Sequence, residues 1–258
     1  MNLARVEYYL SDILSVIETR EIVDGQVITD PLVSENYYGA DSKAAGKYGT
    51  LRIPENLYII GTVNMDETTF PFSRKVLDRA NTIEFSTVDL SADFYDGNAT
   101  PALQLDNYFM KSEYVFFNQC NAHAQLVKDV CSHLQKLNKI LEPANAHVGY
   151  RVRDEVVFYM INNADAELLE ANDAFDNEIM QKILPRIQGS SASVKNMLCE
   201  LFKFCAGDYE GYQTENDDIS SKMLKAANKE NCKYVKSAHK IAYMIRRYEE
   251  DGFTAYWL

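Results

Sequence analysis

The fold class is best read from residues 56–85, NLYIIGTVNMDETTFPFSRKVLDRANTIEF. They open with an apolar run, Leu57–Val63, which is rich in β-branched residues and too short for a buried helix. Such a run predicts a strand covered on both faces, as in a parallel sheet. A short helix is expected at Ser73–Ala80, with Ser73 as its N-cap, and a second strand at Thr82–Phe85. This order of strand, helix and strand predicts one repeat of a larger α/β sheet.

Polar residues gather directly after the first predicted strand. Asn64 ends the apolar run, and Asp66 and Glu67 lie just beyond it. Open α/β sheets form their ligand sites at the carboxyl ends of strands, which makes Asn64 a candidate site residue. Asn64 is also suited to an ordinary turn, and we expect Asp66 and Glu67 to lie in a solvated loop or to contact a partner.

The residues before this stretch predict a helix, a hairpin and a loop. Met1–Thr19 carries apolar residues at helical spacing. Asp24-Gly25 within Glu21–Thr29 is typical of a type I′ hairpin turn, which would place Val23 opposite Gln26. Residues 30–52 are polar and predict a loop. The sequence GADSKAAGK at 39–47 does not qualify as a phosphate-binding loop, because six residues separate its glycines and Tyr48 follows the Lys.

The second half of the chain predicts helices. A turn-rich stretch at 86–106 separates it from the α/β part. Apolar residues then recur every three or four positions, and the tail 253–258 is apolar and predicts a strand or extended arm. We therefore divide the chain into 1–100 as an α/β core, 101–206 as a helical domain and 207–258 as a helical extension. The expected helices cover 118–141, 152–163, 176–187, 193–205, 222–227 and 234–249.

Composition excludes several classes of function. Asp and Glu number 38 against 26 Lys and Arg, a net charge of −12, which disfavours direct binding to nucleic acid. The sequence contains no apolar run of the roughly 20 residues that a membrane span needs. The five cysteines show no CxxC spacing, so no metal site is expected, and reduced thiols are typical of a cytoplasmic protein.

Several phrases together resemble the AAA+ NTPases, in particular the branch around McrB, the GTPase subunit of a modified-cytosine restriction system. The similarity runs from Met1 to about Cys205. The matching phrases are MNLARVE at Met1–Glu7, IPENLYIIGTVN at Ile53–Asn64, VLDRA at Val76–Ala80, GYRVRDE at Gly149–Glu155 and KILPRIQG at Lys182–Gly189.

The resemblance implies a fold of class α/β plus all-α: the C-terminal part of an AAA+ core sheet, followed by a helical lid and a C-terminal helical extension. It also implies roles for single residues. Asn64 would be the sensor at a strand tip that orients the attacking water, and Asn2, next to the Walker B position, would lie near Mg²⁺.

Three arginines are further candidates under this resemblance. Arg79 would act on the phosphoryl group of a neighbouring subunit, with Arg74 as an alternative, although an ion pair between Arg79 and Asp78 explains it equally well. Arg151 or Arg153 would reach the nucleotide from the lid. Because residues two apart on a helix point to different sides, at most one of these two does so, and we favour Arg151.

The sequence departs from the family pattern at two points. The phosphate-binding loop and the Walker B acids would both precede Met1, so we expect this chain to bind no cofactor by itself and to be inactive alone. In the complete protein, the resemblance implies GTP or ATP with Mg²⁺, a hexameric ring and an McrC-like nuclease subunit. The arginine run that usually follows the LDRA phrase is replaced by Asn81-Thr82. The alternative is a non-catalytic helical protein-interaction module with a small α/β cap.

Overall fold

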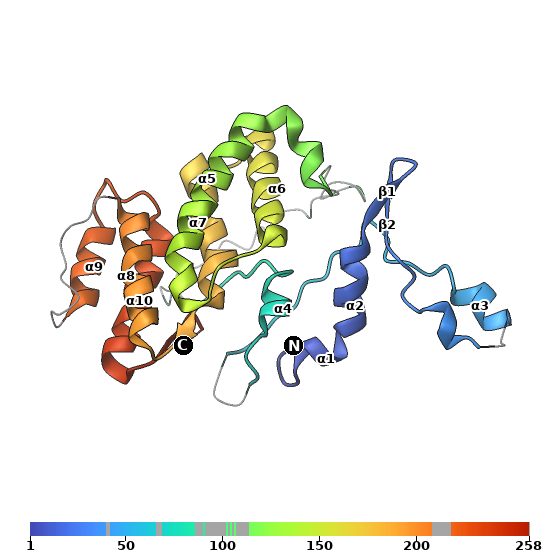
Figure 1. Cartoon of the computed structure of the whole chain (residues 1–258), viewed down its shortest axis with the longest axis horizontal. Helices are drawn as coiled ribbons and strands as arrows, with labels where there is room; N and C mark the ends of the chain where they lie inside the picture. Colours follow the sequence, from blue (N-terminus) through green and yellow to red (C-terminus); the bar gives the residue numbers. More distant parts are fainter. Residues whose placement is uncertain are drawn as a thin grey trace. The chain divides into compact units, whose positions relative to one another are not determined.

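The computed structural model describes residues 1–39, 42–65, 69–85, 90, 102, 104, 106, 114–207 and 218–257 (Figure 1). The chain divides into two compact units. Unit 1 comprises Met1–Ser11, Gly61–Thr82 and Phe116–Leu258, and unit 2 comprises Asp12–Ile60 and Ile83–Val115. Residues 207–258, predicted as an extension, thus belong to the same compact unit as the preceding helices.

Unit 2 contains the predicted hairpin. Strands β1 (Glu21–Val23) and β2 (Gln26–Ile28) pair antiparallel, with Val23 opposite Gln26. Asp24 and Gly25 both have positive φ, 51° and 78°, as a type I′ turn requires. This prediction is confirmed in both turn type and register. The other elements assigned to this part of the chain are α2 (Ser11–Val16), η1 (Ile17–Thr19), η2 (Glu35–Tyr37) and α3 (Ser42–Tyr48).

Two local predictions from the first half are wrong. The loop expected at 30–52 contains helix α3, whose sequence SKAAGKY is rich in the helix formers Ala and Lys. The N-terminal helix begins at Val6 rather than Met1, and it is broken into α1 (Val6–Tyr9), α2 and η1. Asn2 and Leu3 form a turn instead, and the Met1 amino group donates to the carbonyl of Thr62, at 2.8 Å.

The strands expected at Leu57–Val63 and Thr82–Phe85 are not formed by the described residues. Leu57, Tyr58, Ile59 and Ile60 are 41–89% exposed. A strand needs a neighbour to receive its backbone hydrogen bonds, and the described sheets are only the pairs β1–β2 and β3–β4. An α/β core sheet therefore stays a prediction. Asp66 and Glu67 lie outside the described residues, as does most of 86–106.

Unit 1 is helical, and most of its helices follow the prediction. The stretch predicted as one helix at 176–187 is instead α-helical, then π-helical, then 3₁₀-helical, ending around Pro185, which lacks a backbone N–H. The predicted tail strand is confirmed, because β4 (Thr254–Ala255) pairs with β3 (Gln188–Gly189). The elements are α4 (Arg74–Leu77), η3 (Phe117–His123), α5 (Ala124–Leu141), η4 (Glu142–Ala144), α6 (Tyr150–Ala166), α7 (Ala171–Glu178), the π-helical η5 (Ile179–Ile183), η6 (Leu184–Arg186), α8 (Ala192–Ala206), α9 (Ile219–Ala227) and α10 (Val235–Asp251).

Helix α10 is the centre of the packing in unit 1. It contacts α7, α8, α9 and β4, and Figure 1 shows it in orange-red beside α8 and α9. Its inward residues Ile241, Ala242, Met244 and Ile245 are completely buried. Burial on this scale is the main stabilising term of a helical domain.

Two acids, the buried Asp176 and the exposed Glu249, cap helices other than their own. Asp176 of α7 is 3% exposed and accepts hydrogen bonds from the backbone N–H groups of Lys236 and Ser237, at 2.8 and 2.9 Å. Glu249 of α10 likewise accepts from the N–H groups of Ile219 and Ser220, at 2.8 and 3.4 Å. The first N–H groups of α10 and α9, which have no partner within their own helix, are thereby satisfied.

Among the described helices, none is both long and apolar enough to cross a membrane.

Candidate functional site

The structure brings two of the predicted site residues, Asn2 and Asn64, into contact. Asn2 is 2% exposed. Its side-chain amide donates to the backbone carbonyl of Asn64 at 2.7 Å and to that of Phe70 at 3.4 Å. The backbone carbonyl of Asn2 accepts from the N–H of Phe70 at 3.0 Å. Asn2 therefore binds the backbone at both Asn64 and Phe70, and Asn64 itself is exposed.

Helix α4 follows Phe70 in the sequence and connects two parts of unit 1 by its contacts. Val76 and Leu77 are buried, and α4 contacts α1 and η6. Ser73 is at the predicted N-cap position, although its hydroxyl makes no capping bond. Arg79 is half-buried, and its guanidinium donates to the carbonyl of Lys75 within the same turn. The guanidinium of Arg79 is therefore bound to the backbone of helix α4.

Asp78 has a partner that the sequence did not identify. Its carboxylate accepts a hydrogen bond from Nη1 of Arg186 at 2.6 Å, across 108 positions of sequence. The same guanidinium donates through Nη2 to the carbonyl of His147 at 3.3 Å. The side chain of Arg186 is 5% exposed. Burial lowers its pKa and the carboxylate of Asp78 opposes that shift.

The sequence contained a signal for Arg186, because this residue lies in the KILPRIQG phrase that carries part of the resemblance. Its neighbours Leu184, Pro185 and Ile187 are apolar, and all of them are buried. An arginine enclosed by such a run has to enter the core with its charge paired. That pattern was a usable signal, although it did not reveal the partner.

Arg151 and Arg153 point to different environments, as their spacing predicts. Arg151 is exposed. Arg153 is half-buried and forms an ion pair with Asp154, with Nη2 to Oδ1 at 2.5 Å, and its guanidinium lies 3.9 Å from the ring centroid of Phe117. These contacts hold Arg153 between α6 and η3, so Arg151 is the more available of the two for a ligand.

The described residues contain no group of three or more His, Cys, Asp and Glu side chains that would hold a metal ion. The five cysteines are free thiols, and burial raises the pKa of Cys205. The arrangement around Asn2 and Asn64 therefore offers amides and backbone carbonyls, whereas NTP hydrolysis also needs a phosphate loop and a carboxylate for Mg²⁺.

Comparison with known proteins gives one match. Residues 100–253 match the model of a family described as "Domain of unknown function (DUF8727)". Neither the curated proteins nor the solved structures contain a match to this chain.

Proposed function

This chain belongs to the DUF8727 family, a domain of unknown function, and we propose that it supplies the sensor and lid elements of an AAA+ NTPase of the McrB-like branch. The phosphate-binding loop and the Walker B acids would come from elsewhere, since the 258 residues contain no GxxxxGK[ST] sequence. The substrate of the complete enzyme would be GTP or ATP with Mg²⁺.

One observation carries this proposal: phrases that resemble the same family contact each other in pairs. Asn2, from the first phrase, binds Asn64, from the second, across 62 positions. Asp78, from the third phrase, binds Arg186, from the fifth, across 108 positions. The resemblance was drawn from separate stretches of sequence, and contact between them supports the view that they form one functional unit.

Each candidate residue has a role under this proposal. The amide of Asn2 holds the backbone at Asn64, which leaves the exposed Asn64 amide to face a ligand. Arg79 would have to release the carbonyl of Lys75 to reach a neighbouring subunit. Arg151 is the exposed arginine of the lid phrase.

Partners and location follow from the same proposal. The complete enzyme would form a hexameric ring in the cytoplasm and act with an McrC-like nuclease subunit. The net charge of −12 makes direct DNA binding by this chain unfavourable at long range, so recognition of DNA would fall to another domain or subunit.

Nucleotide turnover tests the proposal. GTP and ATP hydrolysis with Mg²⁺ is measured for this chain alone and for a longer polypeptide that joins it to a preceding segment carrying the phosphate loop and the Walker B acids. We expect no turnover from the chain alone and turnover from the longer protein, reduced at least ~100-fold by Asn64→Ala. The matched control is Asn172→Ala, an exposed asparagine on α7. Turnover by the chain alone, or an active Asn64→Ala enzyme, contradicts the proposal.

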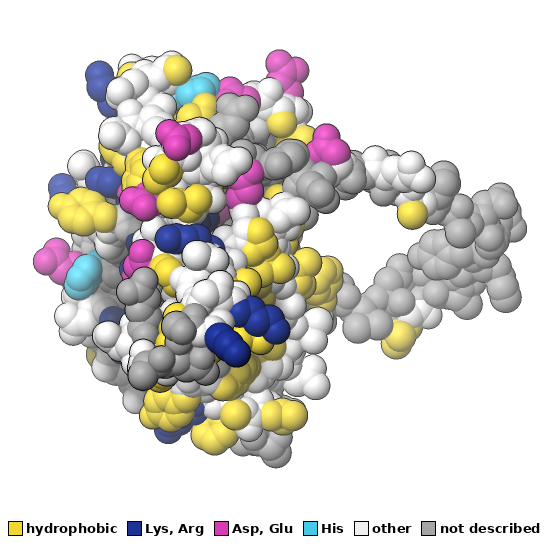
Figure 2. All heavy atoms as spheres, turned by 90° about the vertical axis from the view of Figure 1, so that its right-hand side faces the viewer, with side chains coloured by type: hydrophobic (Ala, Val, Ile, Leu, Met, Phe, Trp, Pro, Cys, Tyr) yellow, Lys and Arg dark blue, Asp and Glu magenta, His cyan; other side chains and the backbone are white. Residues whose placement is uncertain are grey.

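A specific observation favours the second candidate, a non-catalytic interaction module. Leu57, Ile59 and Ile60 are 52, 50 and 89% exposed, and exposed apolar stretches of this kind mark contact surfaces. Figure 2 shows apolar side chains gathered beside Lys and Arg side chains on one face of the molecule. If the longer protein also fails to bind or hydrolyse nucleotide while folding normally, this candidate takes precedence.

A further inference from the structure

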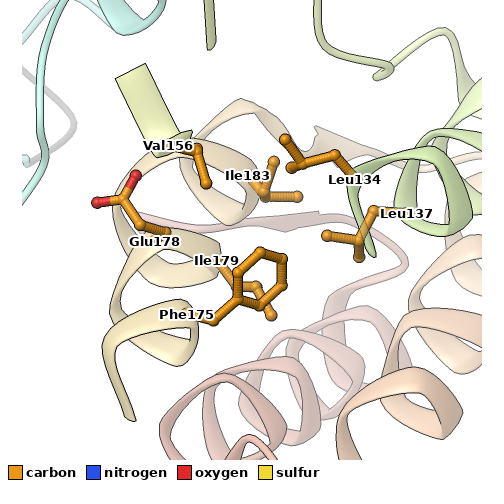
Figure 3. Close-up of a pocket in the computed structure, with 7 residues that line it drawn as sticks. All are labelled: Leu134, Leu137, Val156, Phe175, Glu178, Ile179 and Ile183. Carbon is orange, nitrogen blue, oxygen red and sulfur yellow. The ribbon is translucent and has the colours of Figure 1, made fainter. Parts of the chain in front are cut away.

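A buried carboxyl group without a hydrogen-bond partner lies at the end of α7. Glu178 is 2% exposed, and in the part of the chain that the structure describes neither of its carboxyl oxygens has a partner. It borders a small cavity whose other lining residues are apolar (Figure 3). These residues are Leu134, Leu137, Val156, Phe175, Ile179 and Ile183. An ionised carboxylate is costly in such a place.

Two further charges accompany Glu178. Lys182 of η5 is 1% exposed and forms an ion pair with Glu155 of α6. Burial raises the pKa of Glu178 to about 8, with Glu155 adding to the shift and Lys182 opposing it. At neutral pH, Glu178 is therefore a neutral acid, and the nearby Lys182 is bound to another carboxylate.

The helix changes its hydrogen-bonding pattern at this point. Glu178 ends α7, and Ile179–Ile183 form the π-helical η5. In an α-helix, Glu178 and Lys182 would be four residues apart on one face, which is the favoured geometry for a Glu–Lys pair. The wider π turn displaces Lys182 from that position, and it binds Glu155 instead. Isolated π turns are frequent where a helix has a second available conformation or a functional role.

We propose that η5 is a proton-controlled register switch in which Lys182 exchanges one carboxylate for another. With Glu178 protonated, Lys182 pairs with Glu155 and the turn is π-helical. When Glu178 releases its proton to solvent, Lys182 pairs with Glu178, and Ile179–Ile183 adopt the α-helical register. Loss of the extra residue in the turn rotates the residues that follow, and Arg186, which binds Asp78, is three positions beyond η5.

Other polar groups on the neighbouring helices have hydrogen-bond partners of their own. Helix α5 faces the cavity with Leu134 and Leu137. His133 of the same helix lies 5.4 Å from the ring of Phe175, and its Nδ1 is 2.8 Å from the carbonyl of Asp129. On the side of α10, Asp176 accepts hydrogen bonds from Lys236 and Ser237. The charged groups that face Glu178 are therefore Glu155 from α6 and Lys182 from η5.

The test is an NMR titration of the full chain from about pH 6 to about pH 9.5. We expect the Glu178 carboxyl carbon to titrate near pH 8 and the backbone carbon shifts of Ile179–Ile183 to change with the same midpoint. Glu178→Gln keeps a neutral side chain of the same shape, and its η5 shifts should not respond to pH. Lys182→Met removes the exchanging partner, so the Glu178 midpoint should rise while the backbone response disappears. Glu170→Gln, at the exposed N-cap position just before the same helix, is the control.

Three results overturn the proposal. The first is a Glu178 midpoint below about pH 6. The second is a titration of Glu178 near pH 8 that leaves the η5 backbone unchanged. The third is an unchanged backbone transition in Glu178→Gln. If a variant fails to fold, the first two results are still decided by the unmodified chain, and none of these measurements depends on a nucleotide.

Discussion

Replacing Asp176 by alanine should strongly destabilise unit 1. Asp176 lies on α7, yet its carboxylate accepts from three donors at the start of α10: the N–H groups of Lys236 and Ser237, and the Ser237 hydroxyl at 2.5 Å. Both Asp176 and Ser237 are buried, so water cannot readily replace the lost acceptor. The substitution removes the cap of the central helix without changing that helix's own sequence.

The magnitude follows from the donors left without partners. A buried unsatisfied donor costs about 1–3 kcal/mol, and loss of an N-cap alone costs about 0.5–2 kcal/mol. Allowing for partial relaxation, Asp176→Ala should lower the free energy of unfolding by about 3–5 kcal/mol. Asp176→Asn keeps one carbonyl oxygen as an acceptor but replaces the other with an NH₂ group that cannot accept, so its cost should be smaller, about 1–3 kcal/mol.

Urea unfolding followed by far-ultraviolet circular dichroism measures this loss as a change in midpoint at constant slope. Asp173→Ala is the matched control, because Asp173 lies on the same helix, is exposed and contributes at most a helix-dipole interaction of about 1 kcal/mol. The reasoning is refuted if Asp176→Ala costs no more than Asp173→Ala. It is also refuted if Asp176→Asn is as damaging as Asp176→Ala.

Further predictions concern other buried contacts. The folded pKa of Glu178 is about 8 and its ordinary value is 4.5, so the folded state holds an extra proton between these values. The free energy of unfolding should therefore fall by about 3–5 kcal/mol as pH rises through this window. Glu178→Gln should remove that pH dependence from urea midpoints measured across the range. In a double-mutant cycle by thermal unfolding, Asp78→Ala and Arg186→Ala should show a coupling energy of about 1–3 kcal/mol, and strict additivity would rule out the pairing. Glu249→Ala should cost about 1–2 kcal/mol and increase amide exchange at the start of α9; unchanged exchange there would speak against cross-helix capping. Gly25→Ala forces a side chain into φ of +78° and should destabilise the hairpin by about 1 kcal/mol, which cross-strand NMR contacts report; an unperturbed hairpin would contradict the turn type.

Local sequence patterns predicted the hairpin and the helices that are determined by residues close together in the sequence. The hairpin follows from Asp24-Gly25, which fixes both turn type and register without help from the rest of the chain. Helix α5 follows from apolar residues such as Val130, Leu134 and Leu137 at helical spacing, and these are buried as expected. Each of these signals acts over a few residues, which is why one sequence sufficed.

The remaining features depend on contacts distant in sequence. The apolar run at Leu57–Val63 has the composition of a buried strand, but strand formation requires a neighbour, and periodicity does not reveal whether one is present. The π turn of η5 depends on which carboxylate binds Lys182, and that partner lies 27 positions earlier on α6.

The candidate site shows the same division. The resemblance led to Asn2 and Asn64, which are in contact, because both lie in phrases that resemble the AAA+ family. It did not identify Arg186 as the partner of Asp78, since a pairing across 108 positions leaves no pattern in a single sequence. Arg153 was a candidate by position alone, and its contacts with Asp154 and Phe117 explain it structurally.

The cross-helix caps have a consequence for how this chain folds as it is synthesised. Helix α9 leaves the ribosome before the acid that caps it, because Glu249 follows Ile219 by 30 residues. The cap of α10 is provided by Asp176, 61 residues before Ser237, so α10 finds its acceptor already made. Helix α9 therefore gains its cap only after α10 has been made, against their order in the sequence. A ribosome-stalled chain that ends between α9 and α10 should leave the start of α9 uncapped and open to amide exchange, and synthesis of α10 should protect it.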